Sequence, residues 1–91
     1  MSAYVYILCC GDGTLYTGAA KDLERRLAQH RSGKGAKYTR GRLPLELVYR
    51  ETLADWPAAL RREAEIKRLS RQEKRSLIHL NGENLERLEK I

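Results

Sequence analysis

The sequence has few of the features that mark secreted, membrane-spanning or zinc-binding proteins. No apolar run approaches the roughly 20 residues of a membrane-spanning helix, and residues 1–10 have neither a basic start nor a small-residue cleavage site. Two cysteines are too few for a disulfide framework, and the cysteines and two histidines show no spacing typical of a zinc site. We therefore expect a reduced, cytoplasmic protein that does not associate with membranes.

The two cysteines are adjacent in the chain, at Cys9 and Cys10. Neighbouring side chains of an extended segment point to opposite faces, so this pair cannot easily bridge or chelate one ion. We expect both thiols to pack within a strand.

The chain is short and basic. Its 91 residues, 42% of them apolar, suffice for one small core and leave no room for a second lobe. Eighteen Lys+Arg against 12 Asp+Glu give a net charge of +6. Such an excess attracts polyanions, nucleic acid being the commonest, although many small basic proteins bind nothing specific.

Three segments have the composition of strands. Residues 4–10 are rich in β-branched and aromatic side chains, residues 11–13 have the composition of a tight turn, and residues 14–17 read as the returning strand. Residues 45–52, which follow Pro44, are the third strand candidate.

Capping residues predict the helices. Asp22 caps a helix that runs to residue 30 or 31, and Asp55, two residues before Pro57, caps a helix that runs to about residue 69.

The C-terminal part of the chain is also predicted to be helical. Ser70 and Glu73 have the spacing of a capping box, which opens a helix ending near residues 81–82, and residues 83–91 favour a last short helix. The order of elements predicts an α/β (α+β) fold, with a small three-stranded antiparallel sheet flanked by helices. We expect residues 1–80 to form the domain and residues 81–91 to be a helical extension packed on it.

The helix that follows Asp22 carries charged groups on the face that should meet the core. That face comprises Leu23, Arg26, Leu27 and His30. One interpretation is structural, with the Arg26 stem along the apolar edge and His30 at the helix end. The other is that both side chains belong to a functional site.

The helix that follows Asp55 has a carboxylate on its apolar face. This face comprises Trp56, Ala59, Leu60, Glu63, Ile66 and Lys67. Glu63 lies near its middle, whereas Glu65 lies on the far side and is expected to be solvated. A carboxylate on an apolar face must be paired, protonated or bound to a metal. A structural ion pair with Arg26 or Lys67 is the alternative to metal binding.

The hairpin adds two tyrosines. If residues 11–13 form a three-residue loop, Leu8 opposes Tyr16, and Tyr6 lies diagonal to Tyr16 on one sheet face. A two-residue loop would put the tyrosines on opposite faces. Simple packing is the alternative to a chemical role for this pair.

These residue types suit phosphodiester cleavage. That reaction needs a base, positive charge at the transition state and help for the leaving oxygen. A tyrosine hydroxyl beside a guanidinium loses its proton more easily, and an arginine offers two N–H groups to phosphate oxygens. A carboxylate such as Glu63 can hold Mg²⁺ with few protein ligands.

A basic segment without acidic residues lies between residues 31 and 45. Its basic residues are Arg31, Lys34, Lys37, Arg40 and Arg42. Its glycines allow the backbone to approach a phosphate, and Tyr38 can stack on a base. A solvated flexible loop is the alternative, and we favour a loop that contacts the nucleic-acid backbone.

Taken together, these motifs resemble the GIY-YIG nuclease domain. The matching segments are Tyr4-Val5-Tyr6-Ile7-Leu8, Leu15-Tyr16-Thr17-Gly18 and residues 22–27 with His30. Residues 33–40 and 69–71 are similar to the small stand-alone bacterial branch of that family. The resemblance covers residues 3–78, and the order and spacing of the motifs make it specific.

The resemblance implies a nuclease with one divalent-metal site for Mg²⁺ or Mn²⁺. The motif tyrosines match Tyr6 and Tyr16, and the helix residues match Arg26 and His30. Tyr6 is then the expected general base, directly or through water, while Tyr16 and His30 position water or assist. Arg26 would stabilise the pentavalent phosphate, and Glu63 would hold the metal near the leaving 3′ oxygen.

The sequence also departs from the family pattern. Tyr4 stands at the glycine of the first motif, Thr17 occupies the middle of the second, and Ala19 and Ala20 follow where a hydroxyl residue is common. No asparagine here matches the late asparagine of several family nucleases. We expect an assembled site with slow turnover, and no sequence-specific cutting, because the chain has no room for an attached DNA-binding domain.

Two functions of different classes follow. The first is a metal-dependent endonuclease of low sequence specificity that acts on single-stranded, branched or damaged DNA in repair, recombination or DNA processing. RNA stays open as a substrate, and a protein partner as a source of specificity. The second is a non-catalytic DNA- or RNA-binding module that retains the fold. A protein adaptor using the stripe Leu85, Leu88 and Ile91 is a third.

Overall fold

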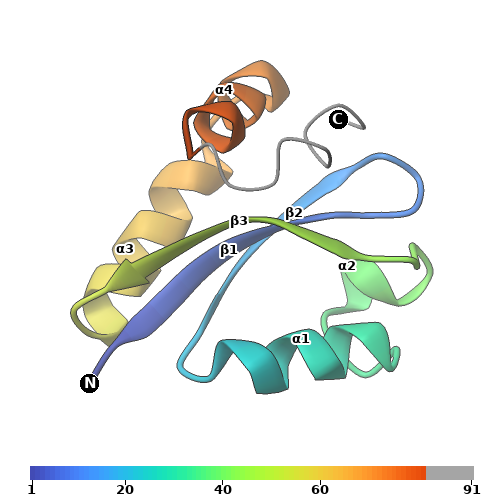
Figure 1. Ribbon diagram of the computed structural model, residues 1–91, viewed down its shortest axis with the longest axis horizontal. Coiled ribbons are helices and arrows are strands. Elements are labelled where there is room, and N and C mark those ends of the chain that lie inside the picture. The colour runs from blue at the N-terminus through green and yellow to red at the C-terminus, as the bar shows by residue number, and fades with distance from the viewer. Residues whose placement is uncertain (82–91) are drawn as a thin grey trace.

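The sheet has three antiparallel strands, as expected. In this computed structural model, which describes residues 1–81, β1 (Ala3–Cys9), β2 (Leu15–Ala20) and β3 (Glu46–Leu53) pair in the order β2-β1-β3 (Figure 1). The predicted fold class is therefore confirmed. The predicted last helix, its apolar stripe and most of the proposed C-terminal extension lie outside the described residues.

The β1–β2 hairpin has the three-residue loop on which the tyrosine pairing depends. The Cys10 N–H donates to the Thr14 carbonyl oxygen at 2.8 Å, and Leu8 pairs with Tyr16. β2 is longer than the predicted strand, because β1 offers it partners as far as Tyr4, opposite Ala20. The last three residues of β2 are a glycine and two alanines, which have low strand propensity, so the sequence pattern did not predict this extension.

Two of the long helices begin at the predicted caps. α1 (Leu23–Arg31) follows Asp22, whose carboxylate accepts from a backbone N–H of the first turn at 3.1 Å. α3 (Trp56–Lys67) follows Asp55, whose carboxylate accepts an equivalent bond at 2.9 Å. The side-chain caps satisfy amide groups that have no partner inside the helix.

The third long helix opens with the predicted capping box. α4 (Arg71–Asn81) is preceded by Ser70, whose Oγ accepts from the Glu73 N–H at 3.1 Å. The Glu73 carboxylate accepts from the Ser70 N–H at 2.9 Å, so the two bonds are reciprocal. No helix within residues 1–81 is long and apolar enough to cross a membrane.

A short helix, α2 (Lys37–Arg40), lies within the segment that we expected to be a loop. Four residues make only one turn, which leaves no apolar periodicity to detect. Nothing in its composition distinguishes it from the rest of the basic segment. The turn has a consequence for the site, because it directs Thr39 inward and leaves Tyr38 partly exposed.

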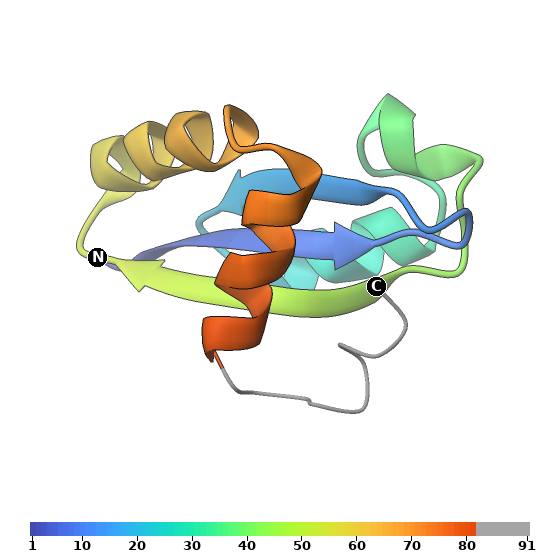
Figure 2. The ribbon, with the colours of Figure 1, turned by 90° about the horizontal axis from the view of Figure 1, so that it is seen from above.

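The sheet separates two cores, and Figure 2 shows α4 crossing one face with α3 beside it while α1 lies on the other. Under α1, the strands contribute Tyr6 and Leu8, which pack with Leu23, Leu27 and Leu45. Under α3 and α4, the cluster is mostly aliphatic and includes Val5, Ile7, Ala59, Ile66 and Ile78. Cys9 and Cys10 join opposite clusters, as their adjacency predicts, and both are free thiols.

The apolar face of α3 is narrower than predicted. Ala59 and Ile66 are completely buried, but Leu60 is 42% exposed and Lys67 is also exposed. The helix thus meets the sheet along one stripe of residues seven apart. Glu63 lies on the flank of this stripe and is only partly buried.

Candidate active site

The tyrosine of the first motif is part of a buried chain of hydrogen bonds. Tyr6 and His30 are fully buried, and the Tyr6 hydroxyl lies 2.8 Å from His30 Nε2. The other ring nitrogen, Nδ1, lies 2.9 Å from Thr39 Oγ1, which in turn donates to the Ala36 carbonyl oxygen at 2.9 Å. We call these four groups, Tyr6, His30, Thr39 and Ala36, the polar chain. It links β1, α1 and the segment around α2.

Burial keeps the two titratable groups of this chain neutral. It raises the pKa of Tyr6 to about 12, although the Arg26 guanidinium beside the hydroxyl acts in the opposite direction. It also lowers the pKa of His30 to about 4, with a further contribution from the positive charge of Arg26. Near pH 7 the site therefore holds a phenol and a neutral imidazole.

Two glycines allow this chain to close. A Cβ atom at Gly18 would lie 2.5 Å from the Tyr6 hydroxyl oxygen, so only glycine fits opposite that ring. A Cβ atom at Gly35 would collide with the His30 imidazole and lie 2.8 Å from its Cα. The glycine that ends the second motif thus makes room for the tyrosine of the first, and Gly35 lets the loop fold over His30.

The second-motif tyrosine lies against the same group. The Tyr16 ring centroid is 6.5 Å from that of Tyr6 and 5.4 Å from that of His30, the latter in an edge-to-face arrangement. The Tyr16 ring also stacks with the Tyr38 ring, at a distance of 5.8 Å between ring centroids. The predicted placement of Tyr6 and Tyr16 on one sheet face is confirmed by the strand register.

Arg42 connects the basic segment to the β1–β2 turn through its side chain. Its guanidinium carbon lies 4.1 Å from the centre of the Tyr38 ring, and it donates to the Tyr38 carbonyl oxygen at 2.5 Å. Its Nε donates to the Asp12 carboxylate at 3.0 Å. These bonds tie the β1–β2 turn to α2, and a phosphate would have to compete with Asp12 for this guanidinium.

Arg26 lies beside the Tyr6 and His30 groups of the polar chain. It is half-buried on α1, its Nη1 donates to Gln29 Oε1 at 3.2 Å, and its charge acts on both Tyr6 and His30. The bond to Gln29 runs along the helix, whereas the effect of the charge on Tyr6 and His30 places the guanidinium beside the polar chain. The position therefore suits a positive charge directed at a phosphate held near Tyr6.

Glu63 has the structural partner that we considered as an alternative. Its carboxylate lies 3.4 Å from Lys67 Nζ, one helical turn along α3, and its side chain is 20% exposed. Its negative charge also contributes to the raised pKa of Tyr6, so the two groups are near one another. By contrast, Glu65 is 63% exposed and solvated, as predicted.

The carboxylate of Glu63 fits a hard divalent cation. Within residues 1–81, no group of three or more His, Cys, Asp and Glu side chains is placed to hold a metal ion. Mg²⁺ keeps most of its waters and is commonly bound by one or two carboxylates together with substrate phosphates, and Mn²⁺ accepts the same oxygen ligands. A single partly exposed carboxylate such as that of Glu63 meets the protein's share of this requirement.

Positive charge surrounds the Tyr38 side of the molecule. The predicted contact residues Lys34, Lys37 and Arg40 are exposed on and around α2. A cavity of about 220 Å³ next to them is lined by Thr14, Leu15, Tyr38, Arg71 and Lys74. Arg71 and Lys74 were not predicted, since they belong to a helix of ordinary mixed charge and only the fold brings them to Tyr38.

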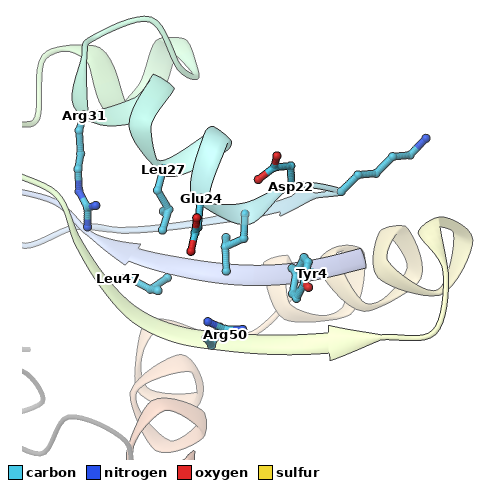
Figure 3. Close-up of a pocket in the computed structure, with 9 residues that line it drawn as sticks. Tyr4, Asp22, Glu24, Leu27, Arg31, Leu47 and Arg50 are labelled. Carbon is cyan, nitrogen blue, oxygen red and sulfur yellow. The ribbon is translucent and has the colours of Figure 1, made fainter. Parts of the chain in front are cut away.

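A second cavity, of about 490 Å³, lies between α1 and the strands β1 and β3 (Figure 3). Tyr4, Leu27, Arg31 and Arg50 are among the residues that line it. None of the five predicted catalytic residues does so. We therefore place the candidate active site at the polar chain, where the chemical groups converge, and not in this cavity.

Comparison with known proteins agrees with the arrangement of these motifs. The model of the GIY-YIG catalytic domain matches residues 2–76. The chain belongs to the GIY-YIG family. A UPF0213 protein of Natronomonas pharaonis is 56% identical over 75 residues, which are 82% of this chain and 88% of that protein. The UPF0213 protein BH0048 of Halalkalibacterium halodurans is 48% identical over 91 residues, covering 100% and 97% of the two chains.

Two solved structures have the same fold. The solution NMR structure of BH0048 from Bacillus halodurans superposes with a TM-score of 0.59 at 47% identity, covering 93% of this chain and 97% of that one. That of the protein EF2693 from E. faecalis gives a TM-score of 0.60 at 37% identity, with 91% and 90% coverage. The resemblance to the small single-domain branch of the family is thereby confirmed.

Proposed function

We propose that this chain is a metal-dependent endonuclease that hydrolyses DNA phosphodiester bonds with low sequence specificity. The observation that carries the proposal is the convergence of Tyr6, Tyr16 and His30 in direct contact, with the Arg26 guanidinium beside the Tyr6 hydroxyl. Membership of a nuclease family supports DNA as the substrate class. We place the protein in the cytoplasm, in DNA repair, recombination or DNA processing.

Each residue has a role that its surroundings support. The Tyr6 oxygen takes a proton from the attacking water as the Tyr6 proton moves to the hydrogen-bonded His30 Nε2, so the phenol need not ionise beforehand. Tyr16 borders both rings and positions the water. The Arg26 guanidinium binds non-bridging phosphate oxygens and stabilises their developing charge.

Glu63 would hold Mg²⁺ or Mn²⁺ when substrate is bound. The ion supplies charge stabilisation for the leaving 3′ oxygen. In the absence of the ion, the Glu63 carboxylate pairs with the Lys67 ammonium. An arriving phosphate would offer the ammonium a second anionic partner and so free the carboxylate to bind the ion. The lowered pKa of His30, which makes it a weak acceptor for the Tyr6 proton, and this competing ion pair both support slow turnover.

The basic surface suits a substrate recognised by its backbone. Lys34, Lys37 and Arg40 flank the site without acidic neighbours in sequence, and Arg71 and Lys74 extend the positive surface along α4. Phosphate contacts position nucleic acid but carry no sequence information. We therefore expect single-stranded, branched or damaged DNA as substrate, RNA as a weaker ligand, and a protein partner as the source of any specificity.

A non-catalytic nucleic-acid-binding module is the second candidate. The contact between Glu63 and Lys67 favours it, because this carboxylate already has a partner without a metal ion. Such a module would bind DNA or RNA with a steep dependence on salt and release no product in Mg²⁺ or Mn²⁺.

A cleavage assay distinguishes the two. Labelled single-stranded, duplex and branched DNA, and RNA, are incubated with the protein in Mg²⁺, Mn²⁺ or EDTA. Glu63→Gln is compared with Glu65→Gln, a solvated carboxylate two positions away on the same helix. We expect metal-dependent products from the wild type and the Glu65 variant, and a loss of roughly a hundredfold in Glu63→Gln.

Products formed at the wild-type rate by Glu63→Gln would contradict the proposal, because the cleavage would then not depend on the proposed metal ligand. Salt-dependent binding with no product from the wild type in either metal would favour the binding module instead.

A further inference from the structure

Thr39 is buried, although it belongs to the basic segment between residues 31 and 45 that we expected to contact nucleic acid. Its exposed fraction is 0%, whereas Tyr38 and Arg40 on either side of it are exposed. A buried hydroxyl is costly unless it is hydrogen-bonded. Thr39 meets this condition with two partners, the Ala36 carbonyl oxygen and His30 Nδ1.

Only one arrangement of hydrogens gives every donor of the polar chain, namely the Tyr6 hydroxyl, one His30 ring N–H and the Thr39 hydroxyl, an acceptor within that chain. The Thr39 hydroxyl has one hydrogen, and it donates this hydrogen to the Ala36 carbonyl oxygen at 2.9 Å. In this arrangement the same oxygen accepts from His30, and Nδ1 carries the ring hydrogen. In a neutral imidazole, Nε2 is then an acceptor, and the Tyr6 hydroxyl donates to it.

We propose that Thr39 is a positioning residue that holds His30 in the tautomer protonated on Nδ1, so that Nε2 is free to receive the Tyr6 proton. This role rests on the proposed nuclease function. The opposite tautomer would place an N–H against the Tyr6 hydroxyl and turn that hydroxyl into an acceptor. Its proton would then point away from the imidazole, and no proton could pass from Tyr6 to His30.

The local backbone is arranged to present this hydroxyl. Thr39 lies in the single turn of α2, and its own N–H also bonds to the Ala36 carbonyl oxygen at 3.1 Å, so the turn itself orients the side chain. Gly35 allows the preceding loop to lie directly on the His30 ring. The segment expected to contact DNA is therefore the same segment that orients the imidazole.

Nuclear magnetic resonance tests the assignment without requiring cleavage. Long-range ¹H–¹⁵N spectra distinguish protonated from unprotonated ring nitrogens, and the chain has only two histidines. The second, His79, is exposed on α4 and serves as the internal reference. Wild type, Thr39→Val and Thr39→Ser are compared at neutral pH, and kcat and KM for cleavage are measured for each protein.

We expect wild-type His30 to carry its hydrogen on Nδ1, and Thr39→Ser to retain that tautomer and most of the cleavage rate. In Thr39→Val, which lacks the hydroxyl but keeps the shape, the hydrogen should move at least partly to Nε2. Its kcat should fall roughly tenfold to a hundredfold with little change in KM, as for other residues that orient a reacting imidazole. The His79 signals should not change.

A wild-type His30 protonated on Nε2 would overturn the proposal before any variant is made. A folded Thr39→Val with the wild-type tautomer and kcat would also overturn it. If the tautomer depends on Thr39 but the wild type cleaves nothing, the hydrogen-bond assignment stands and the proposed nuclease function fails.

Discussion

The face of the sheet under α3 and α4 is closed almost entirely by apolar side chains, whereas the face under α1 encloses a phenol, an imidazole and a hydroxyl. Both faces belong to the same three strands, so alternate residues of β1 serve different purposes. Val5 and Ile7 pack against α3 and α4, and Tyr6 between them turns towards His30. The apolar side stabilises the sheet, and the polar side can then hold reactive groups whose burial costs free energy.

The largest expected effect on stability lies on the apolar side. Ile66 is completely buried under α3, so Ile66→Ala should lower the free energy of unfolding by about 2–5 kcal/mol. Leu60→Ala on the same helix, where the side chain is 42% exposed, is the matched control and should have a much smaller effect. Denaturant unfolding of both variants measures the difference. Equal losses would contradict the assignment of one narrow buried stripe.

The next prediction concerns the polar side, where stability should depend on pH through His30. Its pKa is lowered from 6.5 to about 4 by burial, so between these values the unfolded chain binds a proton that the folded protein does not. Stability is therefore complete above pH 6.5 and falls as the pH drops towards 4, by about 3 kcal/mol from this residue.

Unfolding measured from pH 7 to pH 4 checks this contribution. His79→Gln should retain the full decline, because His79 is exposed, whereas His30→Gln should show a shallower one. If the free energy of unfolding fell equally steeply with pH in both variants, His30 would not be the source of the decline.

The smallest expected effect on stability concerns Thr17, a buried polar residue on the apolar side of the sheet. Thr17 is buried, and within residues 1–81 its Oγ1 has no hydrogen-bond partner. Thr17→Val should therefore raise the free energy of unfolding by about 1 kcal/mol, because it removes an unpaired hydroxyl. Thr52→Val, at an exposed position of β3, is the control. A destabilised Thr17→Val would mean that the hydroxyl has a partner after all.

Much of the fold could be predicted because its signals are local. The caps at Asp22 and Asp55 and the reciprocal bonds of Ser70 and Glu73 join residues three positions apart. The hairpin register followed from one loop length, and it placed Tyr6 and Tyr16 on one face. Polar residues on otherwise apolar helical faces likewise indicated Arg26, His30 and Glu63.

The missed features depend on distant contacts. Thr39 bonds to a ring nine positions away, and Arg42 bonds to an aspartate thirty positions away, so neither partner is visible in local patterns. The single turn of α2 is too short for periodicity. Arg71 and Lys74 border the basic surface only because α4 begins beside Tyr38. The roles of the five predicted catalytic residues stay predictions.

The most direct test of the central claim is the cleavage rate of Tyr6→Phe beside that of Tyr4→Phe, measured under single turnover on a substrate that the wild type cuts. Each variant removes one hydroxyl from β1, and both tyrosines belong to the α1 side of the sheet, but only Tyr6 joins the polar chain. The account predicts a loss of roughly a hundredfold or more in Tyr6→Phe and a wild-type rate in Tyr4→Phe. A folded Tyr6→Phe that cleaves at the wild-type rate would contradict it.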